Sequence, residues 1–230
     1  MRVPQGTDPR TRPPFSRRAR VRWIVRLAPV LGLLAAAGLL PGCGGDGDPE
    51  VDRIDRLREQ KNAAALEREI DAQDSKTSCL AIRALGQLGP PARPQIEKAM
   101  KNPRSEVRQE AAAAYPHTAS GPAAPVLATA ARTDPDAGVR AAAATSLGRM
   151  RALDEMETLL AAVQDADAMV RQRASDAIAR IMGGRFDFSG TEEQRRRTVA
   201  EVRRAWHQDS EILRKYYQTK PGPPPKPSSP

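Results

Sequence analysis

Two cysteines and two histidines are the residues best suited to covalent or metal chemistry in this chain of 230 residues. They are Cys43, Cys79, His117 and His207, and they lie far apart in the sequence. A nucleophile needs a neighbouring base, and a zinc site needs closely spaced nitrogen and sulfur ligands. Neither arrangement occurs, and the chain lacks the motifs G-x-S-x-G and H-E-x-x-H and a phosphate-binding glycine loop. We therefore predict no catalytic residue, no metal site and no cofactor, and we expect Cys79 to be a buried, inert thiol.

Cys43 stands at the end of a segment that predicts export. Seven arginines lie between residues 10 and 26, and the uncharged stretch 27–40 separates them from Cys43. A basic stretch, a short apolar stretch and a small residue before the cut are typical of a secretory signal peptide. A helix of this length spans only about 21 Å, less than the roughly 30 Å hydrocarbon core of a bilayer. A removable signal therefore fits better than a permanent membrane helix.

The residues around Cys43, Leu40-Pro41-Gly42-Cys43, resemble the lipobox of bacterial lipoproteins. The resemblance implies a lipoprotein signal peptide over residues 1–42, cleavage before Cys43 and acylation of that residue. The polar, glycine-rich segment 43–50 then predicts a flexible tether. Three acyl chains would anchor the protein stably in the cell envelope, on the periplasmic side or at the outer membrane. The alternative is an uncleaved anchor beside a spare cysteine.

The body of the chain is a repeat. Segments 102–111, 134–143 and 165–174 align without gaps, and their valines, Val107, Val139 and Val170, are 32 and 31 residues apart. Each copy holds two apolar stretches at helical spacing, and a degenerate copy lies over residues 74–86. The pattern predicts stacked helix pairs.

Particular residues predict where these helices begin and end. Asp136 and Asp167 stand where a helix N-cap needs an acceptor. Gly148 and Gly183 stand where helices should stop. In the second copy Tyr115-Pro116 replaces the Leu-Gly of the other copies, so we expect that helix to break early.

Helix pairs with the pattern D-x-D-x-x-V-R-x-x-A-x-x-x-L-G resemble HEAT repeats, in particular the short bacterial kind found in phycobilisome lyases. The resemblance implies an all-α fold, a short α-solenoid of antiparallel helix pairs over residues 51–183. It also implies that the repeated arginines hydrogen-bond towards aspartates and carbonyl groups of neighbouring turns. We interpret Arg108, Asp136, Arg140, Asp167 and Arg171 as such a structural ladder; the alternative is an anion-binding row on one face.

Residues 184–217 depart from the repeat and predict C-terminal capping helices. Val199, Val202, Trp206 and Ile212 make an apolar stripe at helical spacing. The order Phe-x-Phe followed by a helix with Trp resembles the C-terminal segment of several bacterial HEAT-repeat proteins. It implies that Phe186, Phe188 and Trp206 close the last repeat, with a ligand-binding aromatic cluster as the alternative. The proline-rich segment 218–230 predicts a disordered tail.

The charge distribution ranks the possible functions. The net charge is +9, but residues 1–42 hold eight arginines and one aspartate, which leaves the rest of the chain at only +2. We therefore expect no nucleic-acid binding by the mature chain. The leading hypothesis is a lipid-anchored, non-catalytic scaffold that binds an envelope protein through a face of its B helices, the second helices of the pairs. The second is an enzyme or enzyme accessory of the HEAT-like lyase type. The third is a nucleic-acid binder that keeps its arginine-rich N-terminus.

Overall fold

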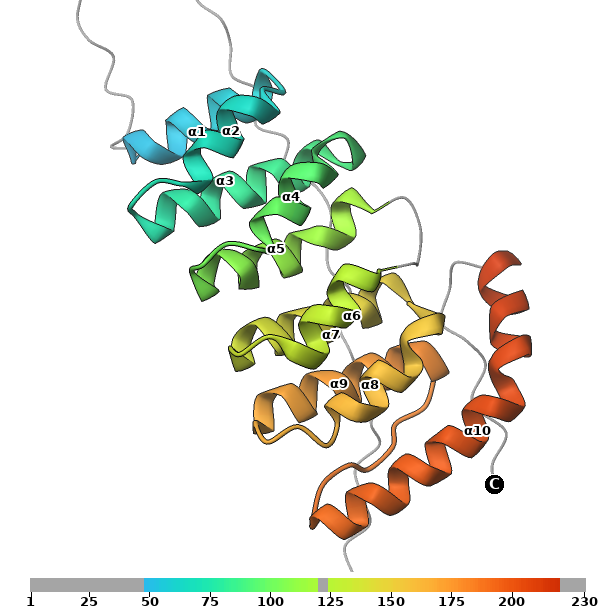
Figure 1. The fold of residues 1–230 in the computed structure, drawn as a ribbon. Helices are drawn as coiled ribbons and strands as arrows, with labels where there is room; N and C mark the ends of the chain where they lie inside the picture. Colours follow the sequence, from blue (N-terminus) through green and yellow to red (C-terminus); the bar gives the residue numbers. More distant parts are fainter. Residues whose placement is uncertain (1–47, 120–123, 220–230) are drawn as a thin grey trace, which may run out of the picture. The chain divides into compact units, whose positions relative to one another are not determined.

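Stacked helix pairs make up the part of the chain that the structure, a computed structural model, describes, namely residues 48–119 and 124–219. Helix α1 (Pro49–Glu59) comes first, four helix pairs follow, and the long helix α10 (Glu192–Thr219) comes last (Figure 1). The first helices of the pairs, called the A helices, are α2 (Ala63–Ile70), α4 (Arg93–Ala99), α6 (Pro125–Thr133) and α8 (Met156–Ala162). The second, the B helices, are α3 (Ser75–Leu88), α5 (Ser105–Thr118), α7 (Ala137–Met150) and α9 (Ala168–Met182). Short 3-10 turns, η1 (Pro90–Ala92) and η2 (Leu153–Glu155), precede α4 and α8.

The B helices pack against one another in chain order, α3 on α5, α5 on α7 and α7 on α9. Each A helix packs against the B helix of its own pair, and α1 lies against α2 and α3. Neighbouring pairs thus bury each other's apolar faces, because a single pair has too little surface to form a core. The predicted all-α solenoid is confirmed.

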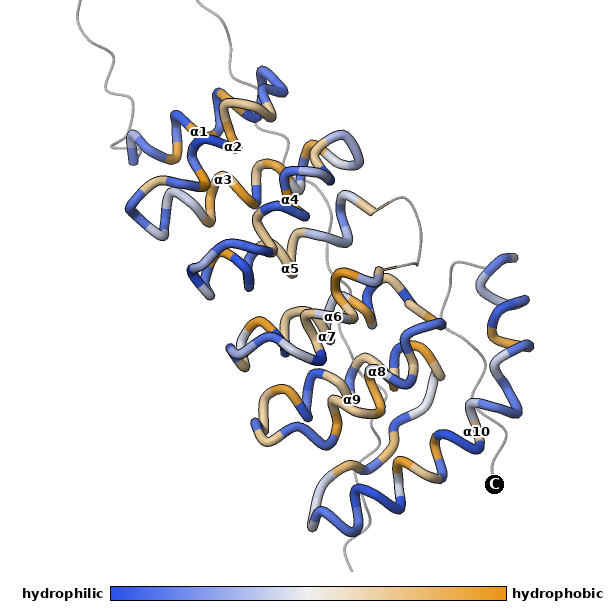
Figure 2. The backbone as a smooth tube through the Cα atoms, in the orientation of Figure 1, coloured by the Kyte–Doolittle hydropathy of each residue, from blue (hydrophilic) through white to orange (hydrophobic). Residues whose placement is uncertain are grey.

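Sequence features of the B helices explain where they begin and which side they bury. Asp74, Asp136 and Asp167 each accept a hydrogen bond from the backbone N–H three residues on, which satisfies an amide that the helix itself cannot pair. Figure 2 shows hydrophobic residues alternating with hydrophilic ones along the helices. The three repeated valines of the sequence pattern are all buried.

Gly148 lies inside α7, so the prediction that this residue stops the helix is wrong. A Cβ atom built on Gly148 would stand 2.6 Å from the Cα and Cβ atoms of Ala177 in α9. The residue is therefore a glycine because two helices approach closely there. The chain leaves α7 at Arg151, whose φ of 52° is left-handed, whereas α9 does end at Gly183 with a φ of 74°.

Helix α5 continues through Pro116 to Thr118, so the predicted early break is also wrong. Proline has no N–H, and the carbonyl of Ala112, four residues earlier, loses its usual helical donor. The hydroxyl of Ser146 in α7 donates a hydrogen bond to that carbonyl at 2.7 Å, in a buried position. The next repeat thus supplies the donor that Pro116 lacks, which lets the helix run on for its last turn.

Residues 184–217 fold as a loop and the single helix α10, instead of the predicted pair of helices. Thr191 and Gln194 exchange side-chain and backbone hydrogen bonds at the start of α10, which is a capping box. Leu213 completes the buried stripe, and Ile212 is 59% exposed. The uninterrupted helix explains this correction, since Leu213 lies 14 residues after Val199 and returns to the same face.

Several predicted segments fall wholly or mostly outside the described residues. These are the signal peptide with Cys43, residues 43–47 of the tether, and the tail beyond Thr219. The other residues of the predicted tether, 48–50, belong to the start of α1, because Asp48 caps that helix by accepting a hydrogen bond from the N–H of Glu50. Residues 218 and 219 of the predicted disordered tail belong to α10. Within residues 48–119 and 124–219, no helix combines the length and the hydrophobicity that crossing a bilayer requires.

Candidate functional site

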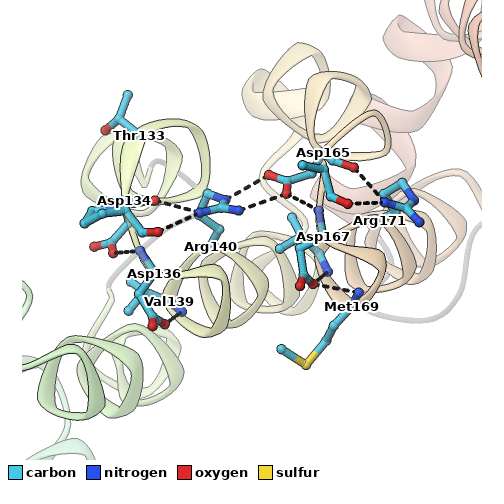
Figure 3. A network of polar contacts seen from close by, with 12 residues as sticks. Thr133, Asp134, Asp136, Val139, Arg140, Asp165, Asp167, Met169 and Arg171 are labelled. Carbon is cyan, nitrogen blue, oxygen red and sulfur yellow. Dashed lines mark hydrogen bonds and ion pairs between the residues drawn. The ribbon is translucent and has the colours of Figure 1, made fainter. Parts of the chain in front are cut away.

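Arginines of the repeat clamp carboxylates of the following repeat. Nε and Nη2 of Arg108 donate to the two carboxylate oxygens of Asp134 at 2.8 and 2.9 Å, and Nη1 donates to the carbonyl oxygen of Asn102 at 2.9 Å. Arg140 binds Asp165 at the same distances, and its Nη1 donates to the carbonyl oxygen of Asp134 at 2.9 Å (Figure 3). Each bidentate pair, called a rung here, joins one helix pair to the next.

Burial and hydrogen bonding act in opposite directions on the carboxylates of the rungs. Burial by itself raises the pKa of Asp134, but hydrogen bonds from Arg108 and from the N–H of Asp136 outweigh it, so the pKa lies below its ordinary value. The pKa of Asp165 is lowered in the same way: burial raises it, and hydrogen bonds from Arg140 and from the N–H of Asp167 outweigh that effect. Both carboxylates are therefore charged at neutral pH, and the rungs are ion pairs.

Asp136 and Asp167 belong to the same turns but bind no arginine in the described structure; they cap α7 and α9. The partners of the arginines are the first aspartates of the two D-x-D turns, Asp134 and Asp165, which the sequence interpretation did not single out. The sequence feature that could have identified them is that each stands two residues before a capping aspartate, in both turns. Both carbonyl and carboxylate partners are internal, so Arg108 and Arg140 serve the stack and not an external anion.

The first junction uses a reversed arrangement. Ser78 stands at the position of the repeated arginine, and Arg104 stands where later repeats have a capping aspartate. Arg104 reaches back to the carbonyl oxygens of Ile70 and Ala72 at 2.6 and 2.8 Å and to the hydroxyl of Ser78 at 3.0 Å. The same turn is thus tied by an arginine from the following repeat, without a carboxylate.

The cysteine and histidines with possible chemistry are not brought together. Cys79 is half-buried, less than predicted, and burial raises the pKa of its thiol, which disfavours the reactive thiolate. His117 lies in α5, with Nη2 of Arg149 3.2 Å from its Nε2, and His207 lies in α10. In the described ranges no three His, Cys, Asp or Glu side chains are grouped so that they could hold a metal.

The predicted aromatic cap lies at the end of the stack. Phe188 and Trp206 are buried with the core of the last repeat, and Phe186 is half-buried beside Phe188 at a ring-centroid distance of 6.5 Å. Arg203 of α10 forms a two-pronged ion pair with Glu157 of α8. The apolar stripe and this ion pair hold α10 against the last helix pair.

The exposed side of the B helices carries two adjoining hollows, called the B-helix groove. One, of about 370 Å³, is lined by Arg83, Gly86, Gln87, Glu110, Ala113, Ala114, His117 and Arg149. The other, of about 330 Å³, is lined by Gln109, Ala113, Gly138, Ala141, Ala142, Thr145, Ser146, Arg149, Met169 and Arg173. Ala113 and Arg149 belong to both, so the groove runs across α3, α5, α7 and α9. Its small residues leave room between successive helices for side chains of a partner.

The groove has unpaired cations and an exposed apolar side chain. Nε of Arg83 lies 2.7 Å from Oε1 of Glu110, so this carboxylate neutralises the charge of Arg83. Within the described ranges Arg149 and Arg173 form no ion pair with a carboxylate, and both are exposed. Met169 beside them is 46% exposed. Positive charge around an apolar, small-residue floor suits an acidic protein surface that also carries apolar side chains.

Among known families, the one that describes HEAT repeats agrees with this architecture. The family model for HEAT repeats matches residues 63–148 and 124–215. Among solved structures, the chain is similar to the complex of CpcE and CpcF of phycocyanin lyase from Nostoc sp. PCC7120, with 23% sequence identity and a TM-score of 0.49. That match covers 63% of this chain and 99% of the other. No curated protein matches the sequence. The family match spans more than half of the residues, and the chain belongs to the HEAT-repeat family.

Proposed function

We propose that this protein is a lipid-anchored, non-catalytic scaffold of the bacterial cell envelope that binds a partner protein through the B-helix groove. The observation that carries the proposal is the groove itself, with small residues along its floor and Arg149, Arg173 and Met169 exposed on it. Solenoids present extended surfaces of this kind for binding.

The charges of the groove indicate the chemistry of the partner. Arg149 and Arg173 lack carboxylate partners within the described residues, whereas most arginines of the inter-repeat contacts have them. Acidic side chains on the partner would supply the missing carboxylates, and apolar side chains between them would fill the hollows. We therefore propose an acidic, amphipathic helix of an envelope protein as the segment that binds.

The anchor in this proposal depends on the sequence alone. The arginine-rich segment, the apolar stretch 27–40 and Cys43 occur in the order of a lipoprotein signal. Acylation of Cys43 would hold the stack at a membrane surface through the short segment 44–48. The groove could then meet a partner from the same compartment.

Metabolic labelling with palmitate tests the anchor. We expect label on the native protein and on a Cys79→Ser variant, but none on a Cys43→Ser variant. Cys79 is the matched control because it is the other cysteine of the chain. Absence of label on all three proteins would contradict the anchor. The uncleaved, arginine-rich N-terminus would then direct attention to nucleic acid.

Site-specific photo-crosslinking in cells tests the groove. A photoreactive residue at Ala142, in the groove, should capture one partner, and the same residue at Ala161, on the exposed side of α8, should not. Charge reversal by Arg149→Glu with Arg173→Glu should abolish capture. Arg68→Glu on α2, which is exposed and outside the groove, should leave it unchanged. Equal capture from both faces, or capture that survives the double reversal, would refute the groove as the binding surface.

A further inference from the structure

A pocket of about 390 Å³ lies at the end of the stack, between α9 and the loop that leads to α10. Its walls are Ala168, Arg171, Gln172, Ser175, Asp176, Ala179, Arg185, Phe186, Asp187, Phe188 and Ser189. None of these residues lines the B-helix groove, so the pocket is a separate surface.

The pocket occupies the side of α9 on which another B helix would pack if the repeat continued. Ala179 holds the repeat position of Gly148, and Gly148 is the residue through which α7 approaches α9. In place of a further helix pair, α10 pairs with α8 through Arg203 and Glu157. On this side of α9 the pocket is lined by the loop residues 185–189 and by no further helix of the described residues.

Arg171 is the last of the repeated arginines, and among the described residues only one side of its guanidinium group is hydrogen-bonded. Its Nη1 donates to the carbonyl oxygens of Asp165 and Ala166 at 2.9 and 2.7 Å, as Arg140 does with its own turn (Figure 3). These two bonds fix the guanidinium as in the preceding rung. Among the described residues, Nε and Nη2 of Arg171 have no hydrogen-bond partner. In Arg108 and Arg140 that edge holds a carboxylate.

We propose that this pocket binds an aspartate side chain of a peptide segment, with both carboxylate oxygens on Nε and Nη2 of Arg171. The other charges of the pocket favour a single carboxylate over a multiply charged anion. Arg171 and Arg185 are balanced by Asp176 and Asp187, so the walls together are neutral, and the two aspartates repel a doubly charged phosphate group more strongly than a singly charged carboxylate. The half-buried Phe186 offers an apolar wall to the residues beside the aspartate.

The turn that fills the preceding rungs indicates the shape of the ligand. Asp134 and Asp165 each accept a further hydrogen bond from the backbone N–H two residues on, at 3.0 and 2.9 Å. The carboxylate that binds is thus part of a compact D-x-D turn. A peptide with this turn presents its carboxylate already oriented, whereas a free carboxylate does not. The inference concerns a second surface and does not depend on the proposed function of the B-helix groove.

Nuclear magnetic resonance of arginine Nε–H groups tests the proposal on the full chain. The probe is the acetylated, amidated tripeptide Asp-Ala-Asp, which copies the turn at residues 165–167, and its Asn-Ala-Asn analogue is the control ligand. We expect a saturable shift of the Arg171 Nε–H signal with the first peptide and none with the second. Arg171→Lys, which removes the signal and thereby assigns it, should raise the Kd measured on backbone amides of the loop about tenfold, because a bidentate pair is lost.

Two further variants separate binding from damage to the fold. Ser175→Leu places bulk in the pocket while Arg171 is retained, and it should also weaken binding. Arg180→Lys, on the same helix but outside the pocket, should bind as the unaltered chain does. The proposal is overturned by an unmoved Arg171 signal, by equal binding of the asparagine peptide, or by equal loss in the Arg180→Lys variant. An equal response to acetate at the same concentration would overturn the assignment to a peptide.

Discussion

The hydrogen bond from Ser146 to the carbonyl of Ala112 should contribute measurably to the free energy of unfolding only because residue 116 is proline. In the native chain Ser146→Ala leaves that carbonyl buried without its donor, since Ser146 is 1% exposed and Ala112 is fully buried. A buried, unsatisfied polar group costs about 1–3 kcal/mol. Packing should contribute little, because alanine already holds the same repeat position at Ala84, Ala114 and Ala177.

A double-mutant cycle isolates this effect. Pro116→Ala restores an N–H four residues after Ala112 and keeps the Cβ atom, so the helix itself can pair the carbonyl. We expect Ser146→Ala to cost about 2 kcal/mol in the native background and below about 0.5 kcal/mol beside Pro116→Ala. The coupling of about 1.5 kcal/mol would be read from urea unfolding followed by circular dichroism. In thermal unfolding the single variant should lose about 4–8 °C, at roughly 2–4 °C per kcal/mol for a chain of this size.

The reasoning fails if Ser146→Ala costs the same in both backgrounds. Equal costs would mean that the hydroxyl stabilises the helix junction by another route, such as packing. A null result in both would mean that the carbonyl finds a different donor. Hydrogen exchange at the new amide of the Pro116→Ala variant provides a second reading, since protection there reports the restored helical bond.

Three more predictions follow from the packing and the rungs. Gly148→Ala should destabilise the protein by about 1–3 kcal/mol through collision with α9, and Ala177→Gly in the same chain should recover part of the loss in urea unfolding. Leu160→Ala should cost about 2–5 kcal/mol because the side chain is fully buried, whereas Ile212→Ala should cost less than about 0.5 kcal/mol; equal costs would reject the assigned helix faces. Asp165 has a lowered pKa in the folded state, so its contribution to the free energy of unfolding is complete above the ordinary aspartate pKa of about 3.9 and is lost as the pH falls through the lowered value. Asp165→Asn should therefore flatten the stability profile as the pH falls below the ordinary aspartate pKa, and an unchanged slope would contradict the ion pair.

Features that repeat along the chain were the ones that could be predicted from the sequence. The spacing of Val107, Val139 and Val170 specified the helix pairs because each pair meets the same neighbours in the same way. The aspartate caps depend only on residues three positions away, and such local chemistry can be read from a single sequence.

Features that depend on one particular neighbour could not be predicted. Pro116 breaks an isolated helix, and only the hydroxyl of a residue 30 positions later removes the penalty. Gly148 looks like a helix stop until Ala177 is placed against it. The reversed contact of Arg104 required knowing which turn lies beside it, although the loss of arginine at Ser78 was visible in the sequence. The B-helix groove likewise arises from residues of four helices that meet only in the fold.

The direction of the rungs bears on how such a chain can lengthen by gene duplication. Arg108 and Arg140 each reach forward to an aspartate of the next unit. The unit of α6 and α7 carries both the acceptor Asp134 and the donor Arg140, so a tandem copy of it inherits both, whereas the unit of α4 and α5 has Asn102 at the acceptor position. The first unit, α2 and α3, has Ser78 in place of the arginine donor and is held instead by Arg104 of the second unit. Two tandem copies of the first unit would therefore have no arginine at either position of the junction between them. Growth by duplication is therefore open at the α6–α7 unit and closed at the beginning of the array.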